Sequence, residues 1–80
     1  MYTASVYMYE IDGEGFFEEE FISENEVIIK QKIMEYINEY KEPNYFIKVI
    51  YEKDGVYIDQ DEFNTDDNGD ICVEGLKAMA

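Results

Sequence analysis

The residues of this chain that could do chemistry are its carboxylates. Twenty aspartates and glutamates stand against six lysines in 80 residues, and the formal net charge is −14. Dense carboxylates can bind a divalent cation, work as an acid and base pair, or present negative charge to a basic partner. They form two blocks, each with a local charge of −8: Glu10, Asp12, Glu14, Glu18, Glu19, Glu20, Glu24 and Glu26 in the first, and Glu52, Asp54, Asp59, Asp61, Glu62, Asp66, Asp67, Asp70 and Glu74, offset by Lys53, in the second.

The residue types that are missing exclude most catalytic chemistry. Because there is no histidine, the chain has no Ser-His-Asp or Cys-His pair and no histidine-containing zinc site. The lone Cys72 cannot form an internal disulfide or a cysteine cluster, and its apolar neighbours indicate a structural role. Glycoside hydrolysis by paired carboxylates needs a cleft between them, and a domain of this size has little room for one. We therefore expect no enzymatic activity and no cofactor.

Residues 63–76 are similar to an EF-hand calcium loop. Gly69 falls at the turn position, but position 12 is Gly75, and Glu74 comes one place early. The residues before the loop also have the pattern of a strand and not of a helix. The alternative is an acidic hairpin turn around Asn68-Gly69, which needs no metal, and it is the interpretation that we favour. In the calcium interpretation, positions 1, 3, 5 and 7 are filled by Asn64, Asp66, Asn68 and Asp70.

The elements that must position these carboxylates begin with two hairpins. Residues 3–10 direct Ala4, Val6 and Met8 to one face and Tyr7 and Tyr9 to the other, which is the period-2 pattern of a strand. After a glycine-rich turn, residues 16–22 are expected to form the return strand, with Phe17 and Phe21 around Glu19 on one face and Glu18 and Glu20 between Phe16 and Ile22 on the other. Residues 45–52 alternate again, and Asp54-Gly55 is a strong hairpin signal before the strand pattern of residues 56–60.

A single helix is predicted between the hairpins. Ser23 and Glu26 have capping-box spacing, so we expect the helix to begin at about Glu24, and Pro43 should stop it. Its apolar stripe, wide enough to cover a sheet, consists of Ile29, Ile33, Tyr36, Ile37 and Tyr40.

This order predicts an α+β fold: one domain over residues 1–80, with a ββαββ core at about 2–63 and an acidic, turn-rich tail at 64–80. One helix should pack on a mainly antiparallel four-stranded sheet, and Ile71 to Val73 could add a short fifth strand or lead into a short helix. By order alone, residues 3–60 resemble the β-grasp arrangement of ubiquitin-like and bacterial immunoglobulin-binding domains. The end at Ala78-Met79-Ala80 lacks the Gly-Gly of a conjugated modifier.

The net charge predicts the kind of partner. Nucleic acids and anionic membranes would repel this chain, whereas basic surfaces would attract it. A net charge of −14 is larger in magnitude than the value of about 2–8 that suffices to keep a small domain soluble. Same-face carboxylates such as Glu18 and Glu20 would lie about 6.6–6.8 Å apart on a strand, near the spacing of alternate phosphates, which follow one another every ~3.4 Å. Four tyrosines could stack on arginines of a partner if they are exposed: Tyr7, Tyr9, Tyr51 and Tyr57. The alternative, favoured for any single tyrosine, is a position at the edge of the core with the hydroxyl in water.

In size and in these two acidic blocks the chain resembles the small DNA-mimic inhibitors of phages and mobile elements, the anti-CRISPR and antirestriction type. The resemblance implies a non-enzymatic inhibitor, monomer or homodimer, that blocks the DNA- or RNA-binding groove of a CRISPR–Cas or restriction nuclease. The start lacks a signal-peptide pattern, so a cytoplasmic location is expected, in the host cell if the protein is phage-encoded. The alternative is a small protein-binding module, such as a β-grasp-like adaptor, or a calcium-binding domain. The expected contact residues are Glu14, Glu18, Glu19, Glu20, Asp59, Asp61, Glu62, Asp66, Asp67 and Asp70.

Overall fold

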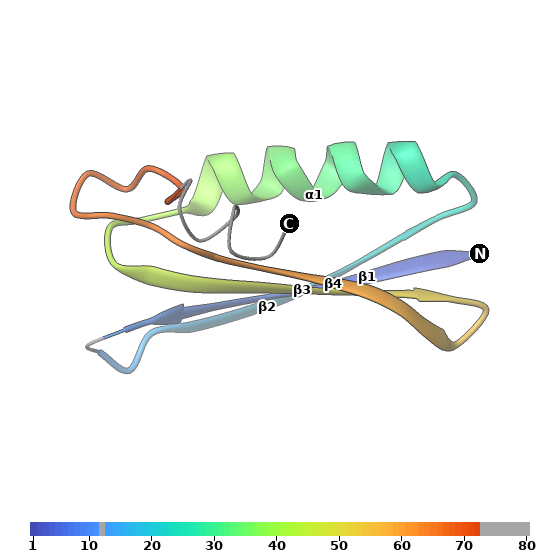
Figure 1. Ribbon diagram of the computed structural model, residues 1–80, viewed down its shortest axis with the longest axis horizontal. Coiled ribbons are helices and arrows are strands. Elements are labelled where there is room, and N and C mark those ends of the chain that lie inside the picture. Colours follow the sequence, from blue (N-terminus) through green and yellow to red (C-terminus); the bar gives the residue numbers. More distant parts are fainter. Residues whose placement is uncertain (12, 73–80) are drawn as a thin grey trace.

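Four strands and one helix follow one another in the predicted ββαββ order. The computed structural model describes residues 1–11 and 13–72. The strands pair antiparallel in the order β2-β1-β3-β4, and α1 lies across one face of the sheet (Figure 1). Among the described residues, no element covers the opposite face, which we call the open face. The elements are β1 (Tyr2–Glu10), β2 (Phe16–Ser23), α1 (Glu26–Tyr40), β3 (Tyr45–Lys53) and β4 (Val56–Asn64).

The core lies between α1 and the two central strands. Alternation along β1 and β3 directs every second side chain toward the helix, and removing these apolar groups from water is the main favourable term in folding. The predicted helix stripe is confirmed at its centre, whereas Tyr36 is half-buried and Tyr40 is 53% exposed at the end of the helix. The buried residues are Ala4, Val6, Met8, Ile29, Ile33, Ile37, Tyr45, Ile47, Val49, Tyr51 and Phe63.

The start of α1 differs from the prediction. Asn25 is the N-cap: its side-chain Oδ1 accepts a hydrogen bond from the Ile28 amide at 3.1 Å. Ser23 is still paired with Tyr2 in the β1–β2 ladder, so it lies too early to cap the helix. Its hydroxyl oxygen instead accepts from the Asn25 amide at 3.1 Å. The helix therefore begins at Glu26, and Ser23 supports the residue that caps it.

The strand order departs from the β-grasp resemblance. In a β-grasp sheet the first and last strands are parallel neighbours at the centre, whereas here β1 pairs antiparallel with β3 and β4 forms an edge. The side chains explain this order. From Tyr45 to Tyr51 the helix-side face of β3 is buried and suits a central strand, but β4 carries Asp59, Asp61 and Glu62, which need access to water. The α+β class is confirmed, and the β-grasp topology is wrong.

The β3–β4 hairpin follows its sequence signal. Asp54 and Gly55 both have positive φ, 52° and 82°, as a tight two-residue turn of this kind requires. The ladder slips once between Tyr51 and Glu52, where β4 has one extra residue. In the described part of the chain, no helix is long and apolar enough to span a membrane.

Candidate partner-binding surface

The first acidic block follows one edge of the sheet. Glu18 and Glu20 on β2 lie across from Tyr7 and Ser5, so their carboxylates project from the open face. Glu19 lies across from the buried Val6 and projects on the helix side. All three glutamates are exposed, as is Glu14 in the turn before β2.

The second block follows the opposite edge, on β4. Asp59 and Asp61 pair with Tyr51 and Val49 and therefore face the helix side, whereas Glu62 pairs with Lys48 on the open face. Since β2 and β4 are separated by three strand spacings, the two acidic edges lie about 14–15 Å apart. The structure thus places the predicted residues on two edges and both faces, and not on one surface.

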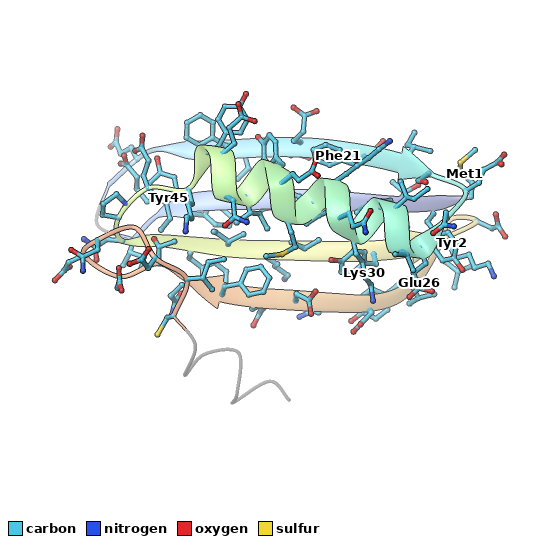
Figure 2. The ribbon with its side chains drawn as sticks, turned by 90° about the horizontal axis from the view of Figure 1, so that it is seen from above. Met1, Tyr2, Phe21, Glu26, Lys30 and Tyr45 are labelled. Carbon is cyan, nitrogen blue, oxygen red and sulfur yellow. The ribbon has the colours of Figure 1, made fainter. Side chains whose placement is uncertain are left out.

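The remaining predicted acids gather at one end of the molecule, which we call the acidic end. The backbone ties three segments together there: the Ile11 amide donates to the Asn44 carbonyl at 3.0 Å, and the Asn44 amide donates to the Asp66 carbonyl at 3.2 Å. This end carries Tyr45 and lies opposite Met1 (Figure 2). The acidic end consists of Glu10, Glu14, Glu42, Asp66, Asp67 and Asp70.

Two members of the acidic end, Glu10 and Glu42, were not among the predicted contacts. Glu10 ends β1, where it accepts a hydrogen bond from the Gly15 amide at 3.1 Å, and Glu42 follows the helix. The sequence pattern alone does not show that the end of α1 lies beside two turns that are far from it in the sequence. Only the order of the strands brings these segments together.

The turn after β4 has the geometry of a carboxylate-capped turn. The Asp66 carboxylate accepts hydrogen bonds from the amides of Asn68 at 2.8 Å and Asp70 at 3.0 Å, and Gly69 takes a positive φ of 82°. The turn is closed by an isolated bridge between Thr65 and Ile71.

The fold around this turn does not support the EF-hand interpretation. Strand β4 stands where an EF-hand would have its first helix. Within residues 1–11 and 13–72, no group of three or more His, Cys, Asp or Glu side chains is placed to hold a metal ion. Of the fifth strand considered for Ile71 to Val73, Ile71 forms only an isolated bridge with Thr65. Val73, the rest of the proposed loop with Glu74 and Gly75, and the alternative of a short helix fall outside the described residues.

Most carboxylates of the described chain have no cationic partner. Within residues 1–11 and 13–72, only three lie within 4.0 Å of a cation: Glu26 with Lys30 at 3.4 Å, Asp54 with the terminal amine at 2.8 Å, and Asp70 with Lys41 at 4.0 Å. The hydrogen bond from that amine, together with its charge, lowers the pKa of Asp54. All the predicted contact acids except Asp70 are thus without an ion pair.

The tyrosines divide between core and surface. Tyr51 is only 6% exposed and faces α1, so it cannot stack on a partner as was considered from the sequence. Its burial, with the nearby Asp61 charge, raises the pKa of its hydroxyl well above the ordinary value. Tyr7, Tyr9 and Tyr57 belong to the open face by their register.

A shallow groove of about 380 Å³ runs between α1 and β2. Phe21, Tyr36 and Tyr40 form its apolar part. The ring centroids of Phe21 and Tyr36 are 5.3 Å apart, and those of Tyr36 and Tyr40 are 4.8 Å apart. Burial, followed by the charge of Glu19, raises the pKa of Tyr36. Three glutamates also line the groove on the helix side, of which Glu19 is a predicted contact and Glu35 and Glu39 are not.

Comparison with known proteins assigns no family to the chain. No protein-family model, curated protein or solved structure matches it significantly. The charge and the surfaces described above are therefore the features from which a function can be inferred.

Proposed function

We propose that this protein is a non-enzymatic inhibitor that mimics nucleic acid and blocks the DNA- or RNA-binding groove of a nuclease complex of the CRISPR–Cas or restriction type. The observation that supports the proposal is the uncompensated charge: within the described chain, carboxylates follow both sheet edges and one end, and only three are ion-paired. Such a surface attracts basic grooves and repels nucleic acid.

The spacing of the acids supports the proposal. On one face of a strand, neighbouring carboxylates such as Glu18 and Glu20 recur about every 6.6–6.8 Å, near twice the ~3.4 Å between phosphates of one DNA strand. The acidic edges are about 14–15 Å apart, comparable with the ~12 Å width of the major groove. Two lines of negative charge at such a separation suit a groove that binds two phosphate backbones.

The proposal places the protein in the cytoplasm of a bacterial host, where nucleases of these kinds meet invading DNA. Its partner is a basic nucleic-acid-binding protein, and it binds no nucleic acid or membrane itself. Glu10 and Glu42 of the acidic end join the predicted contacts in the proposal. The monomer or homodimer expected from the sequence remains a prediction.

A protection assay tests the proposal. Bacterial strains that carry one restriction or CRISPR–Cas system each are challenged with targeted plasmid DNA, with and without the protein. We expect the protein to raise plasmid survival in at least one strain and to inhibit the purified nuclease with a stoichiometric end point. Protection in none of the strains, or inhibition that competing DNA does not relieve, would contradict the proposal.

Charge-matched variants sharpen the assay. The triple variant Glu18→Gln, Glu20→Gln and Glu62→Gln removes three carboxylates of the open face and should lose protection. A control triple, Glu24→Gln, Glu35→Gln and Glu39→Gln, removes the same charge from outside the predicted contacts and should keep protection. Equal loss in both triples would show that only overall charge matters. Binding that tolerates high salt would favour the alternative of an apolar protein-binding module.

A further inference from the structure

The open face carries an aromatic row at its acidic end. Phe16 on β2, Tyr9 on β1 and Phe46 on β3 are direct neighbours in register. The ring centroids are 5.0 Å apart for Tyr9 and Phe16 and 6.1 Å apart for Tyr9 and Phe46. Phe16 is 50% exposed and Tyr9 is 38% exposed. Aromatic rings gathered on an uncovered surface mark an interaction site more often than an ordinary solvated face does.

Carboxylates border this row. The next row of the open face runs from Glu18 through Tyr7 and Lys48 to Glu62, which places glutamates at both edges. On the other side of the aromatic row the turns of the acidic end begin, and Glu10, which ends β1 there, lies across from Tyr45 and projects on the helix side. The arrangement is an aromatic centre with a charged rim, as at the energetically dominant part of many protein interfaces.

We propose that the aromatic row is the docking site for a basic protein partner, which places apolar or arginine side chains on Tyr9, Phe16 and Phe46 and lysines or arginines against the surrounding carboxylates. This inference deepens the proposed function, on which it rests for the nature of the partner. Charge complementarity favours a basic protein at this site over a second copy of the chain or a nucleic acid. A second copy of this chain would set Glu18, Glu20, Glu52 and Glu62 against the same four glutamates, and within residues 1–11 and 13–72 Lys48 is the one cation of this face that offsets them. Nucleic acid would meet the same negative charges.

Two neighbouring phenylalanines provide a matched test. Phe16 and Phe17 are adjacent on β2 and 50% and 49% exposed, but Phe16 faces the open side, whereas Phe17 lies near Tyr45 on the helix side, with ring centroids 6.3 Å apart. The probe is a synthetic leucine–lysine peptide that forms an amphipathic helix. We expect Phe16→Ser to weaken peptide binding more than about tenfold, and Phe17→Ser less than about threefold. Circular dichroism and thermal melting confirm that both variants fold.

The outcomes separate the docking site from the proposed function. Amide shifts of the labelled protein should concentrate on Tyr7, Tyr9, Phe16 and Phe46 when the peptide is added, and oligolysine of equal charge should not reproduce them. Shifts centred on α1, equal effects of the two serine variants, or a dimer that Phe16→Ser dissociates in sedimentation would overturn the docking site. Peptide binding at the row without protection in any strain would overturn only the nuclease proposal, and protection unaffected by Phe16→Ser would overturn only the docking site.

Discussion

Tyr51 shows how the fold changes the chemistry of a single residue. Burial, followed by the charge of Asp61, raises the pKa of its hydroxyl above the ordinary value of 10.0. Because the folded-state pKa is higher than the unfolded one, the stability linked to this proton is fully present below about pH 10 and is lost as the pH rises toward the folded value. We expect Tyr51→Phe to reduce the fall in unfolding free energy between about pH 10 and 12, measured by urea denaturation. Parallel curves for the variant and the wild type would contradict this.

Thr65 holds the acidic end together. It is a buried polar residue whose hydroxyl accepts from the Tyr45 amide at 2.7 Å and donates to the Glu42 carbonyl at 2.5 Å. Thr65→Val keeps the shape but leaves a buried amide without its acceptor, so it should cost about 1–3 kcal/mol of unfolding free energy. Thr65→Ser retains the hydroxyl and is the control. A loss as large for serine as for valine would show that the methyl group matters and the hydrogen bonds do not.

At the scale of the element, the helix start gives a direct comparison of two caps. Asn25→Ala removes the acceptor of the Ile28 amide and should lower the unfolding free energy by about 1 kcal/mol, measured by thermal or denaturant unfolding. Ser23→Ala removes a hydrogen bond outside the helix and should cost less. The reverse ranking would restore Ser23 as the cap predicted from the sequence.

The elements were predictable to the extent that their signals are local. Alternation located the strands, and Asp54-Gly55 located a hairpin, because these patterns act between near neighbours in the chain. Strand order was not predictable from element order, since ββαββ is compatible with β3 or β4 at the centre. The deciding feature was side-chain chemistry along whole strands: the acids of β4 require an edge, and the apolar face of β3 requires a covered position.

The negative charge of the candidate site was predictable from the sequence, but the position of the carboxylates on the surface was not. The two acidic blocks were visible in the sequence, yet the antiparallel order puts them on opposite edges. The aromatic row needs three strands in register, so Phe16, Tyr9 and Phe46 had no common signal. The acidic end likewise depends on backbone contacts between segments far apart in the chain.

At the scale of the whole molecule, a net charge of −14 should destabilise the fold through self-repulsion. Salt screens that repulsion, so the melting temperature should rise as sodium chloride is increased from about 0.01 M to about 0.5 M. The control triple Glu24→Gln, Glu35→Gln and Glu39→Gln should melt higher at low salt and respond less to added salt. A melting temperature independent of salt would show that the exposed carboxylates do not repel one another appreciably.

Mimicry of nucleic acid is tested most directly by competition for a partner. The tagged protein is used to capture partners from a nuclease-treated bacterial lysate at about 0.15 M salt and again at about 0.5 M salt, and duplex DNA is then added. We expect to recover a DNA- or RNA-guided nuclease or a restriction enzyme at low salt, and we expect both the higher salt and the added DNA to release it. Recovery of no basic protein, or of a partner that neither salt nor DNA displaces, would contradict it.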